Sequence, residues 1–558
     1  MDALSGPVPR IQEPVVIPEL NASADASDAG ELTEIRLRQA ELASEDAKIG
    51  HRSGSTNSRE GFQRGVMDRS EHCLAPWCER LDEFSACSLR GNHSMRTLAV
   101  VSGLLAVLGV GDATAAPPRP NFVVIVSDDH TFRAVGYRNP QVQTPHLDEL
   151  AATGFRFDRF FVASPICVAS RASIYSGVYP QQHGSVGLDG RGFAQSVVEQ
   201  RRFLALAEVL NQGGYHTALY GKSHLGDPRR FGFVEGREIA DPNDFEIFAE
   251  ARKFLGRAEN RERPFLLWLT PHNPHLPLSA PAAFLERYAR VDIQLDPNFR
   301  ERPERISLLN QGLPGELFFR DANSTALSGG PPRSAEQMKI FVRAYYAEVS
   351  LLDRQIGDLM HDLRRAGVAE RTIVVYFSDN GYFLGNHGLG NKITMHEESV
   401  RTPCFFHSPL LPRPGARSNA LVGSLDIYPT LLDLAGIVPP PRLMGQSLRK
   451  ILDDPAGEVR DAVVSECVGV GGKLGQGHRM VRTNQYKYML SGDNEEAFFD
   501  LEADPHELHN LAGEARHAKQ LQAHRDRLTA WMEQVGDAHE RPGKARPVTD
   551  AAREPRLP

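Results

Sequence analysis

The sequence is short of three features that would point to particular classes of protein. Its 558 residues contain six cysteines, too few for the disulfide framework of a cysteine-rich secreted domain. It has no long basic run and a formal net charge of −8, so it lacks the electrostatic footprint of a nucleic-acid-binding protein. No apolar run approaches the ~20 residues of a membrane-spanning helix, and we expect no stable span. The remaining composition is that of a soluble globular protein.

One apolar stretch has the layout of a secretory signal, although it lies far along the chain. Residues 95–116 contain Arg96, then an apolar run, then the small-residue site Ala113-Thr114-Ala115. This pattern predicts export to the periplasm or the cell exterior. We interpret the polar residues 1–94 as a mis-called or disordered extension; the alternative is a cytoplasmic tail before a membrane anchor. Export would leave three cysteines, two of which could pair: Cys167, Cys404 and Cys467.

Four short apolar runs predict strands; the first, third and fourth are nearly continuous and suit strands buried on both faces, whereas the second, at 216–220, is a weaker signal. They lie in NFVVIVSDDH (121–130), YHTALYGKSHLG (215–226), RPFLLWLTPHNPH (263–275) and RTIVVYFSDNG (371–381). Apolar residues spaced by three and four predict a long helix over 341–363, and a shorter helix is expected over 203–211. This alternation predicts an α/β fold for residues 117–435, with a large, mostly parallel central sheet sandwiched by helices.

The texture of the chain changes after the Pro-rich connector at 434–448. Short strand-like segments follow, and then a helix is expected over 515–532. We therefore predict a smaller C-terminal α+β domain over 436–535 and an unstructured tail over 536–558.

Each of the four apolar runs ends in polar residues that can perform chemistry. In an open α/β sheet the ligands bind at the carboxyl ends of the strands, so we expect these ends to converge on one crevice. The residues at the four ends, in chain order, are Asp128 and Asp129; Lys222 and His224; His272 and His275; Asp379 and Asn380.

The two acidic ends predict a site for a hard divalent cation. Asp128, Asp129, Asp379 and Asn380 all offer oxygen donors, which suit calcium before magnesium. The alternative is turn or capping chemistry, since Asp and Asn are common at strand ends. Two pairs at neighbouring ends favour the cation, because close carboxylates repel one another unless something neutralises them.

The segment SPICVASRAS (164–173) contains the residue that is hardest to interpret. Taken alone, Cys167 fits a buried apolar residue, since cysteine is among the residue types most often buried. It also stands at the start of a helix expected to run to Ser176, and a helix N-terminus favours an anion beside it.

Several blocks together resemble the type I sulfatases. CVASRASIYSGVYPQQHG (167–184) is similar to that family's signature, Cys-x-Pro-x-Arg followed by a Ser/Thr-Gly-x-Tyr-Pro stretch. SDDH, GKSHLG, PHNPH, SDNGYFLGNHG, NKITMHEESVRTP and FFDLEADPHELHNL look like the family's other blocks in the family's order. The resemblance extends from residue 121 to residue 511 and implies an alkaline phosphatase-like fold.

The resemblance implies a particular chemistry. In the family this cysteine, here Cys167, is oxidised by a formylglycine-generating enzyme to 3-oxoalanine (formylglycine), whose hydrated aldehyde attacks sulfur and then releases sulfate. The expected metal ligands are Asp128, Asp129, Cys167, Asp379 and Asn380, with calcium as the ion and magnesium as the alternative. The expected catalytic residues are Cys167, Arg171 (holding the nucleophile), Lys222 and Lys392 (binding sulfate), His224 (base) and His272 (acid, with Lys392). No role is assigned to His183, His275, His387 or His396, although His275 and His387 are candidates to line the substrate pocket.

One departure from the family pattern keeps alternatives open. Ala169 stands where the family has proline, which puts the conversion of Cys167 in question. The leading interpretation is a sulfuric-ester hydrolase acting on a sulfated carbohydrate, including polysaccharides, or on an aryl or alkyl sulfate. The alternatives are a phosphodiesterase or phosphonate monoester hydrolase of the same superfamily, and a non-catalytic sulfate-ester-binding protein with an unmodified thiol.

Overall fold

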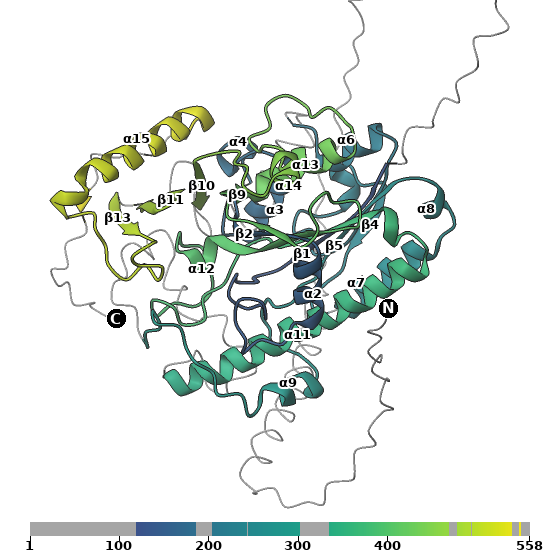
Figure 1. Ribbon diagram of the computed structural model, residues 1–558, viewed down its shortest axis with the longest axis horizontal. Helices are drawn as coiled ribbons and strands as arrows, with labels where there is room; N and C mark the ends of the chain where they lie inside the picture. The colour runs from purple at the N-terminus through teal and green to yellow at the C-terminus, as the bar shows by residue number, and fades with distance from the viewer. Residues whose placement is uncertain are drawn as a thin grey trace, which may run out of the picture. The chain divides into compact units, whose positions relative to one another are not determined.

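Figure 1 shows a computed structural model of the chain, which describes residues 119–185, 203–242, 244–301, 334–467, 477–492, 494–537, 539 and 546–547. The expected signal segment at 95–116 and the extension at 1–94 lie outside these residues, so both interpretations stay predictions. Among the helices of the described residues, none is both long enough and apolar enough to cross a membrane.

A nine-stranded sheet forms the centre of the larger part, in the order β4-β3-β5-β1-β6-β7-β2-β8, with β9 also paired to β2. The four predicted strands are adjacent and mutually parallel, so the prediction of a mostly parallel sheet is confirmed. The strands are β1 (Asn121–Ser127), β2 (Phe155–Phe161), β3 (His216–Gly221), β4 (Glu235–Glu238), β5 (Phe265–Thr270), β6 (Thr372–Ser378), β7 (Arg401–His407), β8 (Ala416–Ser418) and β9 (Val422–Gly423).

The sheet also contains five strands that the sequence did not predict, of which β2 and β7 are the two longest. β7 runs antiparallel to β6, and β2 runs antiparallel to β7, with a register shift between Phe157 and Phe160. β2, FRFDRFF, mixes charged and aromatic residues, and its Arg156, Asp158 and Arg159 are partly exposed. A strand exposed along part of its length lacks the continuous apolar run that marked the four central strands.

Helices cover both faces of the sheet (Figure 1). Phe122 and Val124 of β1 face α3 (Cys167–Ser176), α6 (Leu206–Gln212), α13 (Ile427–Leu434) and α14 (Arg449–Asp453). Val123 and Ile125 face the opposite layer, which consists of α2 (Pro145–Thr153), α7 (Asp244–Gly256) and α11 (Ala335–Arg365). The helices expected over 203–211 and 341–363 are thus α6 and α11. Shorter helices are α4 (Pro180–His183), α8 (Glu259–Glu262), α9 (Ala282–Tyr288) and α12 (Glu397–Val400).

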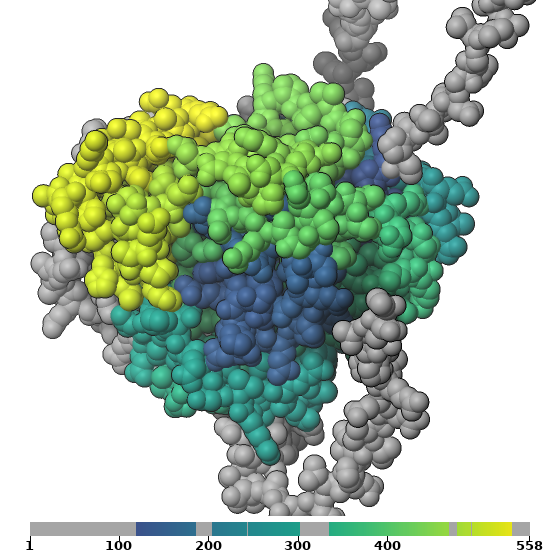
Figure 2. Space-filling view, in the orientation of Figure 1, coloured from purple at the N-terminus to yellow at the C-terminus, as the bar shows by residue number. Residues whose placement is uncertain are grey.

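A second, smaller sheet follows in the C-terminal region. It is antiparallel except for its last pair and consists of β10 (Ala462–Cys467), β11 (His478–Thr483), β12 (Tyr486–Leu490), β13 (Glu495–Asp500) and β14 (Arg546–Pro547). α15 (Ala518–Val535) covers one face through Leu528 and Met532. The other face shares a core with β2, and the C-terminal atoms lie directly against the larger part (Figure 2). The expected α+β architecture is therefore present.

Two further expectations, one about the C-terminal tail and one about the cysteines, differ from what the structure shows. Part of the 536–558 segment is bound to the second sheet: β14 pairs with β13, and the Asp537 carboxylate accepts from Arg479 Nε at 2.6 Å. Arg479 is completely buried and therefore needs a counterion. Cys167 and Cys404 are buried thiols outside any disulfide, so no pair forms among the three cysteines that export would leave.

Candidate active site

The acidic residues at the ends of β1 and β6 lie together. These strands are parallel neighbours with Ser127 opposite Ser378, so the residues after them come out at the same edge of the sheet. The backbone N–H of Asp129 donates to Asp379 Oδ1 at 3.3 Å. Asn380 Nδ2 donates to Asp129 Oδ1 at 2.6 Å. All four predicted oxygen donors therefore belong to one buried cluster.

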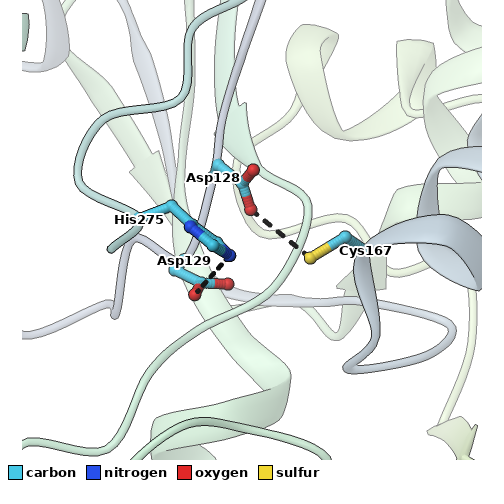
Figure 3. A group of neighbouring side chains, drawn as sticks. All are labelled: Asp128, Asp129, Cys167 and His275. Carbon is cyan, nitrogen blue, oxygen red and sulfur yellow. Dashed lines mark hydrogen bonds and ion pairs between the residues drawn. The ribbon is translucent and has the colours of Figure 1, made fainter. Parts of the chain in front are cut away.

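Cys167 lies beside this cluster, as Figure 3 shows. It is the first residue of α3 and is 2% exposed, and its Sγ lies 3.4 Å from Asp128 Oδ1. α3 has no side-chain hydrogen bond at its N-cap, Ile166, so its N-terminal N–H groups face the site without a side-chain cap. Cys167 therefore adjoins the acidic cluster, as its expected place among the metal ligands requires.

Three cations surround the acids. Arg171, one turn after Cys167 on α3, donates from Nε to Asp379 Oδ2 at 2.8 Å and lies 3.6 Å from Asp128 Oδ2. Lys222, just after β3, forms an ion pair with Asp128. Lys392 donates to both oxygens of Asp129 at 2.6 Å. A site with this many buried cations is suited to a substrate that carries a compact negative charge.

The surroundings shift the pKa values of Asp128 and Asp379 in opposite directions. Burial alone would raise the pKa of Asp128, but Lys222 and the other nearby cations hold it well below its ordinary value. Burial raises the pKa of Asp379 to about 7 despite the opposing charge of Arg171. Burial and the charge of Asp128 raise the pKa of the Cys167 thiol far above its ordinary range. A further cation at this position would favour the ionised forms of these groups.

The donor set fits a divalent cation. Asn380 Oδ1 is buried and makes no hydrogen bond, which leaves an oxygen free to act as a ligand. Donor atoms of Asp128, Asp129, Cys167 and His275 all lie within 4.8 Å of one another. His275, whose Nε2 is 3.7 Å from Asp129 Oδ2, was not among the predicted metal ligands (Figure 3). Its position after β5 was visible in the sequence; its distance from Asp129 was not.

The two histidines with predicted roles are held by carboxylates that the sequence did not single out. His224 has a positive φ of 61°, and its backbone N–H donates to Glu238 Oε1 at 2.9 Å. Its Nδ1 is buried without a hydrogen-bond partner, and burial together with Lys222 lowers its pKa to about 3. His272 lies after β5, 4% exposed, with its Nδ1 3.1 Å from Asp244 Oδ1. An open pocket of about 570 Å³ adjoins His224.

Three of the histidines to which no role was assigned, His183, His387 and His396, make contacts outside the acidic cluster. His183 is fully buried between Ser173 and Ser185. The rings of His387 and His396 are 4.3 Å apart. Asn298 Nδ2 donates toward His387 Nε2 at 3.1 Å, which ties this ring to a network of polar side chains.

That network contains a second group of potential donor atoms, those of His387, Glu398 and Glu507. The Asn298 amide contacts both His387 and Glu398, and Lys487 forms an ion pair with Glu507 at 2.7 Å. The group is thus already partnered by cations and amides of the chain, and it joins the segment around His387 to the C-terminal region.

The fold and the site define a class of protein: an α/β protein whose parallel strand ends bring together acidic residues, a thiol at a helix N-terminus and several cations. The family model "Sulfatase" matches residues 120–437, more than half of the chain, so the chain belongs to the sulfatase family. A second model, "N-sulphoglucosamine sulphohydrolase, C-terminal", matches residues 385–534. The protein is therefore a sulfatase, an enzyme that hydrolyses sulfate esters.

Curated relatives and solved structures agree with this assignment. An ulvan-active sulfatase from Formosa agariphila is 29% identical over 435 residues, covering 71% of this chain and 78% of the relative. An N-acetylglucosamine-6-O-sulfatase from Bacteroides thetaiotaomicron is 27% identical over 478 residues, covering 72% and 84%. A solved structure of a protein in complex with its substrate D-glucosamine-2-N,6-O-disulfate has a TM-score of 0.64 at 23% identity, and the match covers 75% of this chain and 99% of that protein's chain. A phosphonate monoester hydrolase from Agrobacterium radiobacter has a TM-score of 0.62 at 21% identity, covering 75% and 96%. The structures support the alkaline phosphatase-like fold.

Proposed function

We propose that this sulfatase uses a formylglycine made from Cys167 as its nucleophile, beside a bound divalent cation. The observation that carries the proposal is the position of Cys167, 3.4 Å from Asp128 at the N-terminus of α3. Hydrated formylglycine supplies one hydroxyl as nucleophile and a second through which sulfate can leave. A formylglycine-generating enzyme is then a required partner, and it must accept Ala169 in place of proline.

Four side chains would hold the cation, together with residue 167: Asp128, Asp129, Asp379 and Asn380. The oxygen-rich donor set favours calcium over magnesium, and the unpartnered Oδ1 of Asn380 supports a ligand there. Lys222 forms an ion pair with Asp128, and Lys392 forms one with Asp129. Once a bound cation also neutralises these carboxylates, the two lysines would bind the sulfate oxygens. Arg171 would orient both Asp379 and the nucleophile.

Two histidines would move protons. A base must be neutral before it accepts a proton, and the low pKa of His224 leaves its imidazole neutral near pH 7. His224 is therefore the proposed base for the release of sulfate from residue 167. His272, with Lys392, is the proposed acid for the leaving oxygen.

The proposed substrate is a sulfated carbohydrate outside the cytoplasm. The names of two relatives specify ulvan and N-acetylglucosamine-6-O-sulfate, which supports a sugar sulfate as the substrate class. The pocket beside His224, lined by residues that include Arg229, Arg237 and Glu238, offers polar groups and room for the alcohol part of such an ester. The expected signal at 95–116 supports export.

Phosphonate monoester hydrolysis is the second candidate. Two solved phosphonate monoester hydrolases share the fold, with TM-scores of 0.62 and 0.63. A phosphonate ester also presents a tetrahedral centre with anionic oxygens to the same cations. Turnover of an aryl sulfate against an aryl phosphonate separates the two activities.

The decisive experiment combines mass spectrometry with a desulfation screen. The peptide containing residue 167 should be lighter than the cysteine form, because an aldehyde replaces the thiol. The purified protein should release sulfate from a panel of sulfated sugars or an aryl sulfate, and a chelator should stop it. Cys167→Ala should abolish activity, whereas Cys404→Ala, at a buried thiol in β7, serves as the matched control. An unmodified peptide with full activity would refute the formylglycine proposal.

A further inference from the structure

A buried carboxylate outside the strand-end cluster contacts one of the proposed proton carriers. Asp244 is the first residue of α7 and is 3% exposed. Its Oδ1 accepts the backbone N–H of His272 at 2.8 Å and lies 3.1 Å from His272 Nδ1. Its Oδ2 accepts the backbone N–H of Asn273 at 3.0 Å. Asp244 therefore binds both the backbone and the ring of the segment after β5.

These contacts determine which ring nitrogen of His272 is free. An ionised carboxylate only accepts hydrogen bonds, so the contact with Asp244 requires the proton on Nδ1. Nε2 is then the nitrogen left for other partners, as in metal-binding and catalytic histidines whose second nitrogen is held by a carboxylate.

The same segment reaches the acidic cluster. The carbonyl of Asn273 accepts the backbone N–H of Asp128 at 3.4 Å, and His275 lies 3.7 Å from Asp129. The turn after β5 is thus bound to Asp244 on one side and contacts Asp128 and Asp129 on the other. A shift of this turn would move His272 and the acids relative to each other.

We propose that Asp244 is a positioning residue that holds His272 with Nδ1 protonated and Nε2 directed to the leaving oxygen of the ester. This inference rests on the proposed function, in which His272 is the acid. The attacking hydroxyl of residue 167 loses its proton to solvent; as its oxygen bonds to sulfur, the bond from sulfur to the ester oxygen breaks and its electron pair stays on that oxygen. In the imidazolium form, in which both ring nitrogens are protonated, the Nε2 proton moves to the same oxygen and releases the alcohol, while Nδ1–H stays on Asp244 and the ring becomes the neutral Nδ1–H tautomer; water later reprotonates Nε2.

Other ionisable groups face this pair from several elements. Asp241 precedes α7 and Glu348 belongs to α11; Lys222, which follows β3, acts on Asp241. Burial raises the pKa of Asp241 to about 6 and that of Glu348 to about 8. The Glu348 carboxylate accepts the backbone N–H of Ala280, and no described hydrogen bond joins it to His272. Glu348→Gln therefore serves as a matched control: a buried acid of the same neighbourhood that does not hold the ring.

The first test measures how the rate depends on the leaving group. Asp244→Asn, Glu348→Gln and the unaltered enzyme are compared on sulfate esters of 4-nitrophenol, phenol and an alkyl alcohol. Loss of a positioned acid should lower kcat about tenfold or less for the nitrophenyl ester, which needs little protonation, and about 10²- to 10⁴-fold for the alkyl ester. Glu348→Gln should change all three rates by the same factor. An equal loss on all esters in Asp244→Asn would mean a structural role and overturn the proposal.

A second test needs no activity. ¹⁵N NMR of the histidine-labelled full chain, with His272 assigned by its loss in His272→Gln, should show that the neutral ring carries its proton on Nδ1, so that Nε2 is the nitrogen that gains and gives up the second proton of the acid form. Asp244→Asn should change this tautomer balance, whereas Glu348→Gln should not. The opposite tautomer in the unaltered protein contradicts the inference even if every sulfate ester is hydrolysed. Failure to hydrolyse any sulfate ester would instead count against the proposed function, with the NMR result still deciding the tautomer.

Discussion

His183 offers the sharpest test of how this fold treats a buried ionisable group. It ends α4, is completely buried, and accepts the backbone N–H of Ser185 at Nδ1 at 3.0 Å. Its Nε2 lies 3.0 Å from Ser173 Oγ. A ring that accepts at Nδ1 carries its proton on Nε2 and is neutral. A second proton would have to displace the bond from Ser185 inside an apolar region.

The size of the effect follows from the pKa. Burial lowers the pKa of His183 from 6.5 to about 3, so the folded protein binds fewer protons than the unfolded chain. The resulting stability is fully present above pH 6.5 and is lost as the pH falls toward 3. Between about pH 7.5 and pH 5 the titration of the unfolded chain spans roughly 1.5 pH units, which is about 2 kcal/mol.

The assay is urea unfolding of the unaltered protein and of His183→Asn at the two pH values. Asn places an acceptor oxygen near the position of Nδ1, so the bond from Ser185 can persist while the titrating group is gone. We expect the variant to be less stable at pH 7.5, by about 1–3 kcal/mol, through the lost contact with Ser173. The difference between the two proteins should shrink by about 2 kcal/mol at pH 5. A difference that stays constant with pH would refute the neutral, buried assignment, since all other histidines are common to both proteins.

Three further outcomes are expected. Removing divalent cations with a chelator should lower the melting temperature, and restoring calcium at about 100 times its Kd should return about 3 kcal/mol, as read by thermal shift; no shift at any cation concentration argues against the cation site. Lys392→Met should reduce kcat by about 10²- to 10³-fold while the protein stays folded, because it removes a charge from the sulfate, and a normal kcat would exclude that role. Gly381→Ala should lower the melting temperature clearly, because a Cβ at residue 381 would lie 2.0 Å from the carbonyl oxygen of Glu398. Gly256→Ala, whose Cβ would have no neighbouring atom within 4 Å, should leave the melting temperature almost unchanged, and equal melting temperatures of the two variants would contradict the close contact at Gly381.

The fold was predictable where one local pattern sufficed. The runs that contain β1, β5 and β6 are continuously apolar because these strands are covered on both sides, and this pattern can be recognised without neighbours. β2 and β7 were not predicted. Arg156, Asp158 and Arg159 interrupt β2, and Arg156 and Asp158 are bound to each other at 2.9 Å. Such a strand is identified by its partners and not by its own composition.

The candidate site divides in the same way. The acids after β1 and β6 could be grouped because they follow strands, and parallel strands end at a common edge. His275 was expected at the same edge because it follows β5, but its closeness to Asp129 was not predictable, and Asp244 could not be linked to the site at all. Asp244 begins a helix 28 residues before His272, and its contact depends on how α7 packs beside β5.

The sequence by itself determined which segments are strands with reactive ends, where the helix after Cys167 begins, and to which family the motifs are similar. Those properties depend on residue type and on spacing within one segment. Only the tertiary structure decided which cation neutralises which acid, that His275 joins the acidic cluster, and that Asp244 holds His272. The order of the strands and the packing of helices on the sheet arise from contacts between residues far apart in the chain, and no local pattern specifies those contacts.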